Sequence, residues 1–180
     1  RRCRSNPGEL SALGCTVVSG VDVTEKAGLN TLTSAVGERT VDLLINNAGI
    51  LHVDGIDSVL DKIDDIKKQF ETNAIAPLVV TAALRPNLTE GSRVAIIGSR
   101  MGSVSDNESG SYYGYRMSKA AVNQATKSLS VDLAPAGIVV QVFHPGYVDT
   151  DMTSRTQSDQ KISTHTLFIL QLLIVIVVLD

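Results

Sequence analysis

The 180-residue chain has 43% hydrophobic and 19% charged residues and a net charge of −3. These values are typical of one globular domain with a sizeable core, and without a basic patch no nucleic-acid partner is expected. Cys3, Cys15 and three scattered histidines show neither disulfide nor metal-ligand spacing, which predicts a cytoplasmic protein without a bound metal.

Short apolar runs alternate along the chain with longer segments of helical periodicity. The predicted elements, in chain order, are a strand at 16–18, a helix at 25–36, a strand at 41–46, a helix at 63–84, a strand at 93–98, a helix at 112–133 and a strand at 139–143. Thr24 is expected to cap the first helix and Gly37 to end it. Apolar strands separated by helices predict an α/β fold with a doubly wound parallel sheet.

Tyr115 and Lys119 lie four residues apart at the start of the helix predicted at 112–133. Residues with this spacing share a helix face, so a phenol lies beside an ammonium group. A nearby positive charge favours the phenolate and lowers the pKa of a tyrosine, which makes it a plausible acid–base group for a carbonyl/alcohol couple. The alternative is an exposed, solvated pair.

Three polar or turn-forming residues stand at the carboxyl ends of predicted strands. They are Asn46, Ser99 and Pro145. Ligands bind at the carboxyl ends of strands in parallel sheets, so a functional site is expected there. Ser99 offers a hydroxyl that can polarise a substrate carbonyl, or it satisfies the backbone at a strand end. A hydrolase is not indicated, because the sequence around Ser99 lacks the Gly-x-Ser-x-Gly turn of a serine nucleophile.

Asn73 lies within the helix predicted at 63–84, and Pro77 follows four residues later. Proline has no N–H to donate to the carbonyl of Asn73, and its ring pushes that carbonyl aside. We expect a kink that leaves the Asn73 carbonyl available for another donor. A kink that merely faces solvent is the alternative.

Four motifs occur in order: Asn46-Asn-Ala-Gly49, Ser99, Tyr115-x-x-x-Lys119 and Pro145-Gly146. Together they resemble the short-chain dehydrogenase/reductase family over about residues 4–152. The segments 3–7 and 115–119 are most similar to its carbonyl-reductase-like branch, which includes the C-factor and sniffer proteins. The resemblance implies a Rossmann-like NAD(P)-dependent oxidoreductase that interconverts a small-molecule carbonyl and an alcohol by hydride transfer.

The resemblance also implies roles for individual residues. The implied catalytic residues are Tyr115 as acid/base, Lys119 as its pKa-lowering and ribose-binding partner, Ser99 as carbonyl-orienting group and Asn73 as holder of a relay water. The implied cofactor-binding residues are Asp22 and Val23 at the adenine end, Asn47, Ala48 and Gly49 where the backbone is approached, Tyr115 and Lys119, and Pro145, Gly146, Val148 and Thr150 at the nicotinamide. Asp22 has an alternative role as an ordinary helix-start carboxylate.

Arg4 bears on the choice of cofactor. It follows the presumed second strand of the family fold, where an NAD site offers a carboxylate and an NADP site offers an arginine. The segment Cys3-Arg4-Ser5 contains no acid, which favours NADP, with NAD possible.

The family's opening strand and its turn Thr-Gly-x-x-x-Gly-x-Gly have no counterpart in this chain. We therefore interpret the chain as a fragment, in which residues 1–152 form a partial Rossmann-like domain and residues 153–180 form a divergent apolar tail. Because the glycine-rich turn is missing, a non-catalytic binding or signalling protein with the same fold is the alternative function.

The apolar run at 167–179 contains a single polar residue. Thirteen residues are too few to span a bilayer, so we interpret the run as a core segment or a non-native tail, with a membrane anchor as the alternative. The apolar faces of the helices at 63–84 and 112–133 permit a homo-oligomer, although core packing explains them equally well.

Overall fold

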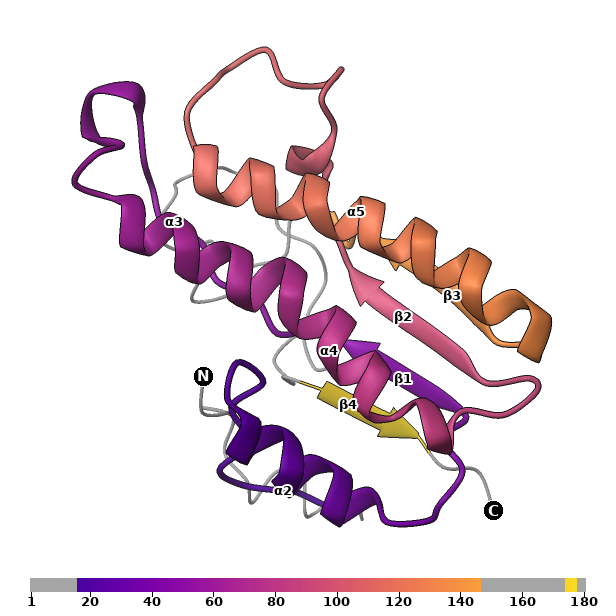
Figure 1. Cartoon of the computed structure of the whole chain (residues 1–180). Helices are drawn as coiled ribbons and strands as arrows, with labels where there is room; N and C mark the ends of the chain where they lie inside the picture. The colour runs from indigo at the N-terminus through magenta and orange to yellow at the C-terminus, as the bar shows by residue number, and fades with distance from the viewer. Residues whose placement is uncertain (1–15, 147–173, 178–180) are drawn as a thin grey trace.

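A computed structural model describes residues 16–146 and 174–177 of the chain. They contain a four-stranded sheet of order β3-β2-β1-β4 (Figure 1). The strands are β1 (Leu43–Asn46), β2 (Arg93–Ile97), β3 (Val139–Phe143) and β4 (Ile174–Val177). β1, β2 and β3 pair in parallel, which confirms the predicted α/β fold with a parallel sheet.

β4 lies antiparallel to β1, with Leu43 opposite Val177 and Asn46 opposite Ile174. No separate strand was predicted there, because the apolar run at 167–179 carries no turn or periodicity that marks a strand. The remainder of that run lies outside the described residues. The strand predicted at 16–18 is wrong: these residues form no ladder, and the edge of β1 pairs with β4 instead.

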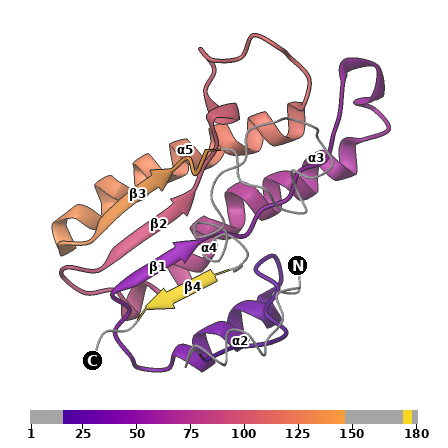
Figure 2. The ribbon, with the colours of Figure 1, turned by 180° about the vertical axis from the view of Figure 1, so that it is seen from behind.

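Helices pack against the sheet mainly from one face. The helices of the described residues are α2 (Lys26–Val36), α3 (Ile63–Phe70), α4 (Ala76–Ala83) and α5 (Tyr113–Leu133). The helices α4 and α5 cover one face of the sheet, α3 packs against α5 beyond the carboxyl ends of the strands, and α2 lies along the β4 side, as Figure 2 shows from behind. None of the helices in this described part is both long and apolar enough to cross a membrane.

The helix predicted at 63–84 is interrupted. A π-helical turn over Glu71–Ile75 separates α3 from α4, and the N–H of Ala76 donates to the carbonyl of Glu71. Pro77 occupies the first turn of α4. Because Pro77 has no N–H for the carbonyl four residues earlier, the ordinary ladder cannot continue, and the wider turn absorbs the disruption.

The start of α2 differs from the prediction. Asp22 Oδ1 accepts hydrogen bonds from the N–H of Thr24 at 2.9 Å and from its hydroxyl at 2.7 Å. The hydroxyl of Thr24 therefore points back to Asp22, and Glu25 occupies the N-cap without a side-chain hydrogen bond. Thr24 as the helix cap was wrong, whereas Gly37 ends the helix as expected, with φ of 62°.

The hydrophobic core lies between the sheet and the helices that cover it. Leu44, Val94, Leu84 and Val122 come from two strands, the end of α4 and α5, and each is exposed by 1% or less. Burial of apolar side chains supplies most of the favourable free energy of folding. These contacts fix α4 and α5 on the sheet and so determine where their polar residues lie.

The parallel pairing brings the ends of three strands to one edge. Asn46 lies opposite Ile96, Ile97 lies opposite Phe143, and the N–H of Gly98 donates to the carbonyl of Phe143 at 2.8 Å. The segments that follow β1, β2 and β3 therefore start side by side. This arrangement agrees with the placement expected from the sequence.

Replacement of Leu84 by alanine tests the core. The residue is completely buried, so Leu84→Ala should lower the free energy of unfolding by about 2–5 kcal/mol through lost burial and a residual cavity. Leu60, which is 87% exposed, is the matched control, and Leu60→Ala should change it by less than about 0.5 kcal/mol. Urea unfolding followed by circular dichroism measures both, and equal effects would contradict the core assignment.

Candidate active site

Tyr115 and Lys119 lie on the face of α5 that is turned toward the protein interior. Their exposed fractions are 8% and 4%, so the pair is not the solvated surface pair of the alternative interpretation. The Lys119 Nζ lies 5.8 Å from the centroid of the Tyr115 ring. The spacing of four residues thus places a phenol and an ammonium group together in a buried environment.

Lys119 connects α5 to the edge of the sheet. Its Nζ donates a hydrogen bond to the carbonyl of Ile97, the last residue of β2, at 2.7 Å. A Cβ placed on Gly49 would lie 3.9 Å from the same Nζ. Burial lowers the pKa of Lys119 to about 8, because the charged form loses its hydration. The lysine therefore lies between the end of β2 and the loop that follows β1.

The pKa of Tyr115 differs from the sequence-based prediction. Burial of the phenol raises its pKa above the ordinary value of 10.0, and a hydrogen bond with the side chain of Ser99 acts in the opposite direction. The expected lowering by Lys119 is not what the structure shows. The reason is that burial disfavours the phenolate, while the Lys119 ammonium donates its hydrogen bond to the carbonyl of Ile97.

Ser99 follows β2 and lies beside the phenol of Tyr115. Its Oγ accepts a hydrogen bond from the N–H of Met101 at 3.2 Å and so caps a short 3₁₀ turn over Arg100–Gly102. A Cβ on Gly102 would lie only 2.7 Å from the backbone of Lys119. The turn is therefore pressed closely against α5, which brings the Ser99 hydroxyl to Tyr115.

Asn73 lies in the π-helical turn and is only 1% exposed, so the solvent-facing alternative is excluded. Its Oδ1 accepts from the N–H of Ile50 at 2.8 Å, and its Nδ2 donates to the Ile50 carbonyl at 2.9 Å and to Ser118 Oγ at 3.0 Å. The side chain thus ties the loop after β1 to α5. That Asn73 holds a relay water remains a prediction. Because the side chain is already hydrogen-bonded, the backbone carbonyl of Asn73 is the group that would bind the water.

Ser118 is a residue that the sequence interpretation missed. It is completely buried, receives the hydrogen bond from Asn73, and donates its own hydroxyl proton to the carbonyl of Tyr115 at 2.8 Å. The only sequence signal was its place inside the Tyr-x-x-x-Lys motif, since its main partner is 45 residues away. Ser118 couples Asn73 to the backbone of the helical turn that carries the phenol.

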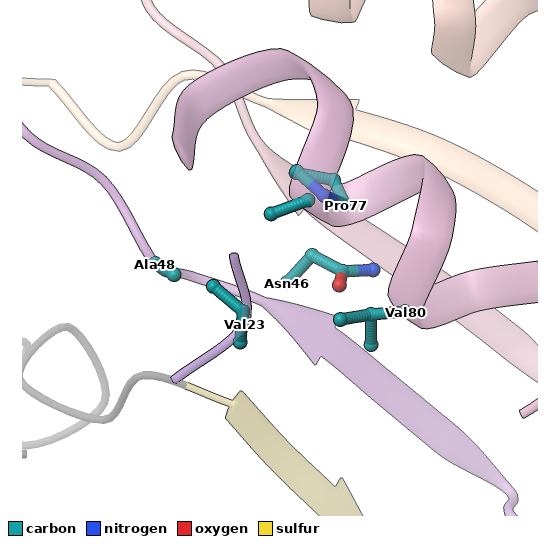
Figure 3. A pocket seen from close by; sticks show the side chains of 6 residues that line it. Val23, Asn46, Ala48, Pro77 and Val80 are labelled. Carbon is teal, nitrogen blue, oxygen red and sulfur yellow. The ribbon is translucent and has the colours of Figure 1, made fainter. Parts of the chain in front are cut away.

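A small, mostly apolar pocket lies beside the carboxyl end of β1 (Figure 3). About 160 Å³ of space lies between and in front of its lining atoms, and this volume includes open solvent. Its lining residues are Val23, Asn46, Ala48, Ala76, Pro77 and Val80. Asn46 turns its amide to the hydroxyl of Thr81 at 3.2 Å. Val23 and Ala48, two of the predicted cofactor-binding residues, therefore line the same pocket.

The remaining predicted cofactor residues are only partly described. The pKa of Asp22 is lowered to about 2, first of all by its hydrogen bond from the hydroxyl of Thr24, as for a helix-start carboxylate. Pro145 and Gly146 follow β3 at the same sheet edge as Asn47 and Gly49. Arg4, Val148 and Thr150 lie outside the described residues. Among the described residues, no cluster of His, Cys, Asp or Glu could hold a metal ion.

Comparison with known proteins agrees with this geometry. Residues 5–161 match the family described as short chain dehydrogenase, and the chain belongs to that family. It is 50% identical over 116 residues to C-signal of Myxococcus xanthus, covering 62% of this chain and 68% of that protein. It is 40% identical over 153 residues to 1-hydroxy-2-glutathionyl-2-methyl-3-butene dehydrogenase of Rhodococcus sp. (strain AD45), covering 84% and 67%.

Solved structures agree with the fold. The carbonyl reductase Sniffer of D. melanogaster superposes with a TM-score of 0.75 at 28% identity, over 95% of this chain and 77% of that one. An NADPH-bound carbonyl reductase from chicken fatty liver gives 0.73 at 30% identity, over 86% and 69%. These similarities confirm the resemblance to the branch that includes the C-factor and sniffer proteins, and the chain spans about two thirds of the length of its curated relatives.

The buried Lys119 predicts a pH-dependent stability. Its pKa is about 8 in the folded chain and 10.5 as the ordinary value, so between these values the unfolded chain binds more protons. Burial of the ammonium costs free energy in the folded chain. This cost falls as the pH rises above 8, because the folded lysine then loses its proton. Ionisation of unfolded tyrosine opposes this effect above about pH 10, because the folded pKa of Tyr115 is raised.

The free energy of unfolding should therefore rise between pH 8 and 10 by an amount on the order of 2 kcal/mol that depends on Lys119. Urea unfolding at intervals of one pH unit measures it. Lys119→Met should remove the rise, whereas Lys127→Met, at an exposed position of the same helix, should retain it. Equal pH profiles for the wild type and Lys119→Met would contradict the assigned pKa.

Proposed function

We propose that the protein is an NAD(P)-dependent oxidoreductase that interconverts a small carbonyl compound and an alcohol. The observation that carries this proposal is the trio of buried Tyr115, buried Lys119 and half-buried Ser99 at the carboxyl edge of the parallel strands. A phenol, an ammonium group and a hydroxyl gathered at one point can hold and protonate a carbonyl oxygen. The substrate class is a small molecule with an accessible carbonyl or hydroxyl group.

The residues beside the trio fit a dinucleotide. Ala48 and Gly49 keep the loop after β1 small, and a Cβ on Gly49 would lie 3.6 Å from Asn73 Oδ1 and 3.9 Å from Lys119 Nζ. A larger residue there would fill the space next to the lysine, where a ribose hydroxyl could accept a hydrogen bond from the Lys119 ammonium. When bound, the nicotinamide cofactor supplies or accepts the hydride. Tyr115, Lys119 and Ser99 handle the proton and the carbonyl oxygen.

Tyr115 is the proposed proton donor. Its raised pKa keeps the phenol protonated near neutral pH, which is the form that can donate to a carbonyl oxygen during reduction. Ser99 donates a second hydrogen bond to the same oxygen and polarises it. As the proton leaves Tyr115, the ammonium of Lys119, 5.8 Å from the ring centroid, stabilises the phenolate that forms. The arrangement can therefore protonate the carbonyl oxygen when the reaction runs as a reduction.

A homo-oligomer is part of the proposal. Ile75 and Leu78 near the start of α4 and Val131 near the end of α5 are exposed by 52%, 41% and 56%. These apolar side chains, carried by the two segments whose faces were expected to permit association, could pack against a second copy. The size of the assembly does not enter the proposed chemistry.

The catalytic proposal is tested with Tyr115→Phe in full-length protein, with small aldehydes, ketones or quinones and NADPH. Removal of the phenol proton should lower kcat by about 10²–10⁴-fold, the usual contribution of a general acid. Tyr113→Phe, at a 36% exposed position two residues earlier, is the control and should retain wild-type turnover. Unchanged turnover in Tyr115→Phe would remove the mechanism, and absence of NADPH binding by the wild type would favour the non-catalytic alternative.

The proposed preference for NADP is tested at Arg4. Solved relatives include structures with bound NADPH, such as the chicken carbonyl reductase. If Arg4 binds a 2′-phosphate, the charge-assisted contact is worth on the order of 1.5–3 kcal/mol. Arg4→Asp should then raise the KM for NADPH at least about tenfold while leaving use of NADH unchanged or improved. Equal losses with both cofactors would indicate a structural role.

A further inference from the structure

Asp54 accepts hydrogen bonds from the backbone at the start of α5. Its backbone carbonyl accepts from the N–H of Tyr112 at 2.9 Å, its Oδ1 accepts from the N–H of Tyr113, and its Oδ2 accepts from the N–H of Gly114 at 3.0 Å. The residue is only 3% exposed. Asp54 therefore accepts hydrogen bonds from three consecutive backbone N–H groups, and the residue that follows them in the helix is Tyr115.

The backbone just before α5 adopts an unfavourable conformation. Ser111 and Tyr112 have φ of 52° and 53°, in the left-handed region that side-chain-bearing residues rarely occupy. Hydrogen bonds from outside this segment must stabilise such a turn, and Asp54 supplies them to Tyr112 and to the two residues that follow. The carboxylate also lies at the helix N-terminus, where the peptide dipoles favour negative charge.

The loop that carries Asp54 is itself fixed from α3 and the π-helical turn. The Asn73 side chain binds both backbone groups of Ile50, and Oε1 of the completely buried Gln69 accepts from the N–H of His52 at 3.0 Å. Gly114 lets α5 approach closely, because a Cβ there would lie 2.4 Å from Gln69 Nε2. The first turn of α5 is thus held on one side by a carboxylate and on the other by α3.

We propose that Asp54 is a positioning residue that sets the place of the Tyr115 phenol relative to Ser99 and Lys119. The inference rests on the proposed function, since it assigns Asp54 a part in the same proton transfer. The hydrogen bonds of Asp54 go to the backbone of residues 112–114, so it would act on the phenol through that backbone. An ordinary structural cap would stabilise the protein without affecting the reaction selectively.

The test compares Asp54→Asn and Asp54→Ala with the wild type in full-length protein. Asn retains one acceptor oxygen and the side-chain shape, so it guards against loss of folding. Asp57→Asn, an exposed acid three residues later, is the matched control. We expect kcat to fall about 10- to 100-fold in Asp54→Ala and less in Asp54→Asn, as for a small misplacement of a reacting group. The KM for NADPH should change less than about twofold.

Two measurements do not depend on turnover. Hydrogen exchange of the Tyr113 and Gly114 amides should accelerate at least about tenfold in Asp54→Ala, while exchange at Val122, in the middle of α5, is unchanged. The pKa of Tyr115, followed by NMR of the ring carbon that bears the hydroxyl, should fall toward its ordinary value, because a loosened turn admits water. If Tyr115→Phe were fully active, the proposed function would fail, yet these two measurements would still report whether Asp54 positions the phenol.

Two results would overturn the proposal. One is an unchanged kcat and an unchanged Tyr115 pKa in Asp54→Ala. The other is a loss of kcat matched by an equal rise in KM and by faster exchange along the whole of α5, which would identify Asp54 as a stabilising residue without a specific effect on the phenol.

Discussion

The placement of the site depends on a proline that cannot donate a hydrogen bond. Pro77 forces the helical ladder to widen into the π-helical turn over Glu71–Ile75, and the turn carries Asn73 into the interior. There its amide binds the loop after β1 and, through Ser118, the helix that bears Tyr115. The π-helical turn thus connects its own helix to the loop after β1 and to α5. Both polar atoms of the Asn73 side chain form hydrogen bonds in this connection.

Burial acts on the two titratable residues in a related way. It raises the pKa of Tyr115 and lowers that of Lys119, so in each residue it favours the neutral form. An ion pair of phenolate and ammonium is therefore not the resting state of this site. In the proposed reaction the phenol therefore holds its proton until a substrate oxygen is there to receive it. In this view the lysine matters most when negative charge develops on the phenol.

Local sequence patterns predicted the parallel strands, the edge at which they end and the residues gathered there. They succeeded because apolar runs, Gly37 and the Tyr-x-x-x-Lys spacing act over a few residues. They failed where the deciding partner is distant: β4 is defined by its pairing with β1, and Asp54 by amides about 60 residues away. The prediction that Thr24 caps α2 was wrong for a different reason. The hydroxyl of Thr24 donates a hydrogen bond to the nearby carboxylate of Asp22 instead. The raised pKa of Tyr115 reflects burial, which a helical spacing cannot reveal.

Gly114, in the first turn of α5, bears on how the surroundings of Tyr115 form. A Cβ on Gly114 would lie 2.4 Å from Gln69 Nε2, so only a residue without a side chain lets α5 lie this close to α3. The buried surroundings of Tyr115 are thus created by tertiary structure and are absent from the isolated helix. In a newly made chain in which the loop after β1 has not yet docked, burial does not yet raise the pKa of Tyr115, so these surroundings arise only when that part of the fold is complete.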